Sequence, residues 1–463
     1  MHTTNAAVSP VSGIKLRRDV GFVALVFAMV GLNIGSSLFV LTGVAAGLTG
    51  PSLFIAQLLS AAPVLLALVP YMTLTSAMPM TCANYQYAKL FSMPLAVAAW
   101  MVMFVAIPLG AFPLFSIATA KLLAILIPET PIIITAIGVM TLFYVLNIVG
   151  IKSATNVQFA LVVILFLALF TFIFPGIPAI DVNNLTPLFT GGVIGFIGAA
   201  AIIYTLVAGG LFGIEIGGEV KNARAALPKA LFISIIIVVV IYLLIEVVAV
   251  GVMDTKLFAR ETLGIPAAVF LSQPWLGFFI VGGGIMASVT TINLILTMAG
   301  RYALVFARDG FFPGVFGRIN GRFGTPHWGL TLPWLMTTAL LLIMLFTNIS
   351  PSLEILGAML NLGLLFMITL VLLAAWRLPR KHPEIYAEST YKFSPRLIAV
   401  TSLTAAAINI VFMVLLMVLL ARTQIWTMVL FIAAAIAGIV LYYVRRRQPG
   451  YLRRASSTIE QAE

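Results

Sequence analysis

The chain has 463 residues, of which 62% are hydrophobic and only 9% are charged, and its mean hydropathy is +1.15. Soluble domains carry about 25% charged residues, so this chain has more apolar surface than a core could hide. The composition excludes a soluble globular protein, and we expect most of the chain to lie in a lipid bilayer.

Apolar runs of about 20 residues, the length that crosses the hydrocarbon of a bilayer, follow one another along the chain. They are continuous rather than alternating in polarity, so they predict helices and not the strands of a barrel. The sequence predicts an all-α polytopic membrane protein with 12 transmembrane helices, at residues 20–47, 52–78, 93–124, 131–149, 155–175, 191–217, 228–251, 275–306, 328–347, 351–376, 395–421 and 424–445.

No sizeable polar segment separates these runs, which predicts a single transmembrane domain over residues 16–447 between two short tails, 1–15 and 448–463. Positive residues gather on the cytoplasmic side of membrane proteins. With both ends on one side, that side holds 22 of the 26 Lys and Arg residues, and the other holds Lys121, Lys256, Arg260 and Arg422. We expect both tails in the cytoplasm and the protein in the cytoplasmic (inner or plasma) membrane.

The net charge of +12 then reflects the Lys and Arg residues that set the orientation in the membrane and are attracted to anionic lipid. We therefore expect no nucleic-acid partner. Cys82 is the single cysteine and lies on the cytoplasmic side, so we expect no internal disulfide and no disulfide-linked partner. The histidines lie in tails or loops, and the spans carry no metal cluster, catalytic triad or phosphate loop. We therefore expect no enzymatic activity, and no cofactor apart from a coupling ion.

Small and polar residues interrupt two spans near their middle, around Gly31 to Ser37 in the first and around Gly209 and Gly210 in the sixth. One such interruption is equally typical of close helix packing. Two interruptions five spans apart favour inverted repeats, in which unwound helices line a binding site. The repeats would cover about 20–175 and 191–376, with the helices at 395–445 outside them.

Unwinding exposes peptide groups that can bind a charged ligand. Free amides at the start of a helix, expected at Ser36, Ser37 and Leu38, favour an anionic group. Freed carbonyls, expected at Leu32, Asn33, Thr205 and Ala208, favour an ammonium group. A zwitterion fits both, so we expect an amino acid or related small amine, bound by Leu32, Asn33, Gly35, Ser36, Ser37, Leu38, Tyr204, Thr205, Ala208, Gly209 and Gly210.

Polar residues within the spans are candidates for coupling to H⁺ or Na⁺. Glu246 is the deepest acid and is either a proton-titrating group or a structural acid bonded to a neighbouring hydroxyl. Glu215 lies nearer the cytoplasm, where a solvated vestibule is the favoured interpretation. Thr290 and Thr291 either bond to the preceding turn or join carbonyls of Gly31 and Ile34 as oxygen ligands of a sodium ion.

Short motifs stand in one order along nearly the whole chain. They are Gly35-Ser36-Ser37-Leu38-Phe39, Thr81-Cys82-Ala83-Asn84-Tyr85-Gln86-Tyr87, Asn147-Ile148-Val149-Gly150-Ile151-Lys152, Glu219-Val220-Lys221-Asn222, Ala307-Arg308-Asp309-Gly310-Phe311-Phe312-Pro313 with Gly324-Thr325-Pro326, and Arg377-Leu378-Pro379-Arg380-Lys381-His382-Pro383-Glu384. Together they resemble the motifs of the amino acid–polyamine–organocation permeases.

The resemblance implies a five-plus-five inverted-repeat fold with discontinuous helices 1 and 6, a substrate carboxylate on the helix 1 amides, and a substrate amine on carbonyls of helices 1 and 6. Three positions depart from the family pattern. Ser37 stands where glycine is usual in the family. Thr205 stands where many members carry a gating aromatic residue, for which Tyr204 or Phe212 could substitute. Leu165 stands where some members carry a lysine that resembles a bound cation. Proton coupling through that lysine is therefore excluded.

Three other functions compete with an amino acid transporter that works by alternating access. A polyamine or inorganic-cation transporter of the same fold needs several acids at the site, and only Glu215 and Glu246 are available. A non-transporting sensor or a channel would show no saturable, counterflow-stimulated uptake. The sequence favours a secondary transporter that works by cation symport or by exchange.

Overall fold

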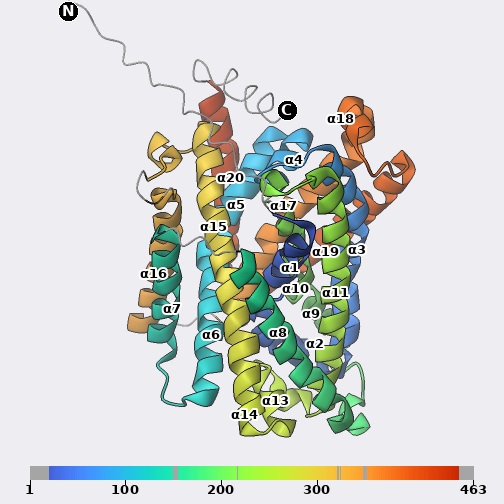
Figure 1. The fold of residues 1–463 in the computed structure, drawn as a ribbon, viewed down its shortest axis with the longest axis vertical. Helices are drawn as coiled ribbons and strands as arrows, with labels where there is room; N and C mark the ends of the chain where they lie inside the picture. Colours follow the sequence, from blue (N-terminus) through green and yellow to red (C-terminus); the bar gives the residue numbers. More distant parts are fainter. Residues whose placement is uncertain are drawn as a thin grey trace, which may run out of the picture.

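The computed structural model describes residues 20–149, 155–215, 217–320, 323, 325–347 and 352–447, which form a bundle of helices (Figure 1). The main helices are α1 (Phe22–Asn33), α2 (Ser36–Thr49), α3 (Leu53–Ala77), α4 (Ala83–Phe91), α5 (Met93–Ala106), α6 (Phe112–Leu126), α7 (Ile132–Val149), α8 (Thr155–Gly176), α9 (Gly192–Ile202), α10 (Tyr204–Ala208), α11 (Ala223–Gly251), α15 (Met286–Arg308), α16 (His327–Thr347), α17 (Leu353–Lys381), α19 (Pro395–Thr423) and α20 (Ile425–Arg446). The predicted tails and the motif residues Gly150, Ile151, Lys152 and Gly324 lie outside the described residues.

Shorter helical segments connect or extend these helices. They are η1 (Gly50–Ser52), η2 (Ile107–Ala111), η3 (Ile177–Ala179), η4 (Val182–Leu185), η5 (Gly209–Glu215), η6 (Gly217–Glu219), α12 (Thr255–Phe258), α13 (Gly264–Phe270), α14 (Gln273–Phe278), η7 (Phe279–Ile285), η8 (Gly314–Gly317) and α18 (Pro383–Glu388).

Eleven apolar helical runs in the described part of the chain are long enough to cross a membrane, so the protein is an all-helical, multi-pass membrane protein. The count is one below the predicted twelve, because the run Ser36–Ala77 combines α2, η1 and α3, and α1 by itself has only 12 residues. Within that run the chain turns at Gly50, whose φ of 73° is a conformation that glycine adopts without strain.

The broken helices lie in the middle of the bundle. Figure 1 shows α1, α9 and α10 among α3, α8, α11 and α17, and most of these neighbours pack directly on one or more of the broken helices. The helix α17 is almost entirely buried, whereas few residues of α7 and α20 are buried. Large apolar side chains such as Phe174, Phe346 and Trp426 cover the exposed faces, as a lipid environment requires.

Two prolines bend the third predicted span. The helix α5 passes into α6 through the wide turn η2, which contains Pro108, and Pro113 stands at the start of α6. Proline lacks an amide donor and crowds the preceding turn, so the helical hydrogen-bond ladder widens at this point.

Candidate functional site

The first break separates α1 from α2 at Ile34 and Gly35. The Gly35 amide turns back to the Asn33 carbonyl at 2.8 Å, and Gly35 continues in an extended conformation. No side chain caps α2, so the amides of Ser36 and Ser37 lack an intrahelical acceptor and form a positive helix end. The prediction was wrong for Leu38, whose amide donates to the Gly35 carbonyl at 3.1 Å.

The second break separates α9 from α10 at Ile203 and continues past Ala208, where the chain tightens into η5. The Leu206 amide donates to Ile203 at 2.9 Å instead of reaching Ile202, which releases the Ile202 carbonyl from the helix. The Thr205 carbonyl, expected to be free, accepts from the Gly209 amide, which leaves it one lone pair for a ligand. The break thus begins six residues earlier than the glycines indicated.

The two breaks meet at the side chain of Asn33. A Cβ on Gly209 would lie 3.3 Å from Asn33 Oδ1 and 3.8 Å from the Leu32 carbonyl, and a Cβ on Gly210 would overlap Asn33 Nδ2. The Asn33 side chain is only 2% exposed, and its amide has no hydrogen-bond partner among the described residues. An unpaired buried amide at this position suits a site that a ligand completes.

The helix α15 closes the site from the other side. Thr290 Oγ1 lies 3.4 Å from the Gly31 carbonyl and donates at 3.0 Å to Ala287 in its own helix. Thr291 Oγ1 would lie 2.8 Å from a Cβ on Gly35 and, like Ser36 Oγ, has no partner within the described chain. The structure therefore brings Gly31, Thr290 and Thr291 together at the first break. Ile34 is buried beside them, and its amide donates to the Val30 carbonyl.

Two side chains that the sequence analysis missed hold the breaks in place. Tyr242 of α11 donates its hydroxyl to the Asn33 carbonyl at 2.7 Å; because this carbonyl also accepts from the Gly35 amide, it is not free, contrary to the prediction. Asn361 of α17 donates Nδ2 to the released Ile202 carbonyl at 2.7 Å, and also to Gly357 at 2.9 Å. A polar residue in an otherwise apolar helix is the sequence signal that could have singled out both residues.

Glu215 is buried, contrary to the expectation of a solvated vestibule acid. It is 2% exposed, and its Oε1 accepts from Asn84 Nδ2 at 2.7 Å and from the Asn84 amide at 3.2 Å. Tyr71 donates to the other side of the same Asn84 at 2.7 Å. Glu215 thus joins η5 to the start of α4, where Cys82 has a left-handed φ of 55°.

Glu246 differs from Glu215 because neither of its oxygens has a hydrogen-bond partner within the described chain, although the side chain is 0% exposed. It lies one turn beyond Tyr242 on α11. On α15, Asn293 lies beyond Thr290 and Thr291 and its Oδ1 accepts from Asn147 of α7 at 2.8 Å. The side chain of Glu219 lies outside the described residues.

Tyr204 faces α19 in this conformation. Its ring packs edge-on against Phe412 at a centroid distance of 6.0 Å, and its hydroxyl lies beside the side chain of Asn409. The hydroxyl-bearing Thr205 and the apolar Ala208 are buried next to it.

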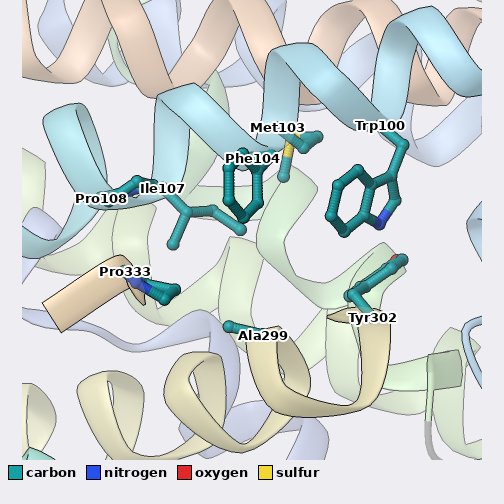
Figure 2. A pocket seen from close by; sticks show the side chains of 8 residues that line it. All are labelled: Trp100, Met103, Phe104, Ile107, Pro108, Ala299, Tyr302 and Pro333. Carbon is teal, nitrogen blue, oxygen red and sulfur yellow. The ribbon is translucent and has the colours of Figure 1, made fainter. Parts of the chain in front are cut away.

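An apolar pocket lies apart from the breaks, between α5, η2, α15 and α16 (Figure 2). Figure 2 shows Trp100 and Phe104 of α5 facing Ala299 and Tyr302 of α15, with Pro333 of α16 at the far end. Its lining contains no charged side chain, so neither charge of a zwitterion would find a partner there. The polar groups that suit such a ligand are at the meeting point of the two breaks.

Comparisons with known proteins identify the family of the chain. Residues 20–442 match the family model described as amino acid permease. Two proteins of Bacillus subtilis (strain 168) are each 26% identical over 407 residues, or 82% of the chain: a branched-chain amino acid permease, covered over 84% of its length, and a methylthioribose transporter, covered over 85%. An aspartate–proton symporter of the same organism is 26% identical over 219 residues, 43% of this chain and 41% of that protein.

Proposed function

Because the chain belongs to the amino acid permease family and is a transporter, we propose that it carries an amino acid with a neutral side chain across the cytoplasmic membrane by alternating access. The observation that carries this proposal is the set of unpaired neutral groups at the breaks: the Ser36 and Ser37 amides and the side chains of Asn33, Ser36 and Thr291. The amides would bind the carboxylate, and the carbonyls of Leu32 and Thr205 together with the side-chain oxygen of Asn33 would bind the ammonium group.

A neutral substrate side chain fits because charged residues are lacking around the breaks. The segments α1, α2 and α10 contain no Asp, Glu, Lys, Arg or His, and the Glu215 carboxylate of η5 is bound to Asn84. A cationic or acidic side chain, or a polyamine, would be buried without a counter-charge. The names of the three relatives specify a branched-chain amino acid, methylthioribose and aspartate. Of these compounds, a branched-chain amino acid is the one that fits this site.

The topology of twelve spans with both termini cytoplasmic is part of the proposal. In this topology α1 and α2 together would form a first crossing of the length predicted for 20–47, and α3 would form the second. The second break would then fall in the sixth crossing, five spans after the first, as two inverted repeats require.

A thermal-shift screen of the purified protein tests the substrate class. A ligand that binds the folded state at 100 times its Kd adds about 2.7 kcal/mol of stability. We expect neutral amino acids to raise the unfolding temperature, and lysine, arginine, aspartate, putrescine and methylthioribose to leave it unchanged. Stabilisation by a charged compound alone contradicts the proposal.

Two coupling ions remain candidates for the transport cycle. A sodium ion would bind carbonyls of Gly31 and Ile34 together with the hydroxyls of Thr290 and Thr291, and this is supported by the 3.4 Å approach of Thr290 to Gly31. A proton would bind Glu215 or Glu246. Uptake into proteoliposomes with choline in place of sodium separates them, since unchanged uptake eliminates the sodium site.

A further inference from the structure

We propose that Glu246 is the proton-binding group through which transport is coupled to a proton gradient, an inference that rests on the proposed transport function. Glu246 is fully buried, and neither carboxyl oxygen has a hydrogen-bond partner in the described part of the chain. Burying an unpaired carboxylate in an apolar medium is prohibitively costly, so the group stays buried only in its protonated form. The closed arrangement around it therefore requires a bound proton.

The described elements that pack against α11 contribute no positive charge that could replace this proton. The helix α11 packs against α1, α2, α3, α8, α10 and the turns η1, η3, η4, η5 and η6. None of the elements that pack against α11 contains Lys, Arg or His, and α11 itself carries Arg224 and Lys229 only in its first two turns, at the opposite end from Glu246. At the helix 5 position discussed above, α8 carries the buried apolar Leu165.

The titratable groups on these elements are few, and most are engaged elsewhere. Tyr242, one turn away on the same helix, is the one beside Glu246. Tyr71 donates to Asn84, Glu215 accepts from Asn84, and Tyr204 lies beside Asn409. Glu219 belongs to η6, near the opposite end of α11. The loop residue Asp181 meets α11 through its backbone amide at Gly251, about 7 Å along the helix from Glu246.

The contacts distinguish Glu246 from the other coupling candidates. Glu215 Oε1 accepts two hydrogen bonds from Asn84, so this acid already joins η5 to α4. Thr290 donates its hydroxyl to the Ala287 carbonyl of its own helix at 3.0 Å, and its approach to Gly31 is longer. Glu246 alone among these groups is an ionisable side chain whose polar atoms all lack a partner.

The position of Glu246 connects its proton to the substrate site. Tyr242, one helical turn away, donates its hydroxyl to the Asn33 carbonyl at the first break. When the site opens to water, the carboxyl O–H bond breaks and the proton passes to water on that side, with no oxidation or reduction. The carboxylate then needs solvation, so α11 and α1 cannot close again until Glu246 takes up another proton.

Proteoliposomes under a pH gradient test this coupling. A gradient of one pH unit can drive roughly tenfold accumulation when one proton accompanies each substrate molecule. We expect the wild type to accumulate a neutral amino acid identified in the thermal-shift screen. We also expect the lumen to become more acidic, as measured with a pH-sensitive dye, when that substrate is added outside. Glu246→Gln imitates the protonated side chain permanently, so we expect it to lose accumulation and acidification while keeping counterflow exchange. Glu129→Gln, which alters an exposed acid between α6 and α7, should keep all three activities.

The possible results separate this inference from the transport proposal. Counterflow by the wild type without proton movement, or full pH-driven accumulation by Glu246→Gln, overturns the role of Glu246 and leaves transport intact. A wild type that shows no counterflow with any neutral amino acid overturns the proposed function itself. If Glu246→Gln does not fold, the proton flux of the wild type still decides whether transport is proton-coupled.

Discussion

Replacing Gly35 by alanine should destabilise the closed protein because of close packing and not because of backbone strain. Gly35 has φ −95° and ψ 174°, an extended conformation open to any residue. An added Cβ, however, would lie 2.8 Å from Thr291 Oγ1 and 3.3 Å from its Cγ2. Thr291 is buried and β-branched, so its side chain has few rotamers in which to retreat. Overpacking of this kind costs about 1–3 kcal/mol.

The double variant Gly35→Ala/Thr291→Ala tests this explanation. It removes both clashing atoms and leaves only the Thr291 Cβ at 3.4 Å, an ordinary contact. Thermal unfolding and counterflow uptake should therefore recover in the double variant, with a coupling energy of about 0.5–3 kcal/mol. Gly138→Ala is the control, since a Cβ there would meet nothing within 4 Å. A stable, active Gly35→Ala, or a double variant no better than the single, refutes the reasoning.

Three further substitutions test the anchoring of the breaks. Asn361→Leu leaves the Ile202 carbonyl buried without its donor, so the free energy of unfolding should fall by about 1–3 kcal/mol. Unchanged thermal unfolding of this variant would contradict the role of Asn361. Tyr242→Phe leaves the Asn33 carbonyl with the Gly35 amide only, so thermal unfolding should show a loss of about 0.5–1.5 kcal/mol together with slower uptake. Gly210→Ala places a Cβ on Asn33 Nδ2 and should abolish substrate-induced thermal stabilisation, whereas retained stabilisation would show that the breaks can separate.

The sequence located the first break to within a residue or two, but of the second break it located only the later part, at Gly209, and missed the beginning at Ile203. Glycine and serine in an apolar run are local signals, and α1 does end between Gly31 and Gly35. The helix α9 instead ends at Ile202, in a stretch of alanine and isoleucine with no such signal. Its end is accompanied by a donor from Asn361, 159 residues away along the chain. Only the fold brings that donor to Ile202.

Glu215 and Glu246 also show what the local sequence can indicate and what only the fold reveals. The sequence identified Glu215 and Glu246 as unusual because both lie in apolar spans, and it could not tell which one has a partner. Asn84, which binds Glu215, belongs to a motif that was recognised for its resemblance alone and lies 131 residues away. Glu246 has no such hydrogen-bond partner in the described part of the chain, and this could be learned only from the packing.

The two breaks follow one physical rule, which explains how the site can be both polar and movable. Each released carbonyl is bound by one neutral side chain from a helix outside the break, Tyr242 for Asn33 and Asn361 for Ile202. A neutral hydrogen bond contributes about 0.5–1.5 kcal/mol net, so either anchor can be exchanged for water at small cost when the site opens. A buried ion pair in the same place would leave an uncompensated charge on separation, at about 3–5 kcal/mol. Neutral anchors thus keep the unwound segments in position while leaving the energy difference between open and closed states small enough for a substrate and a proton to reverse.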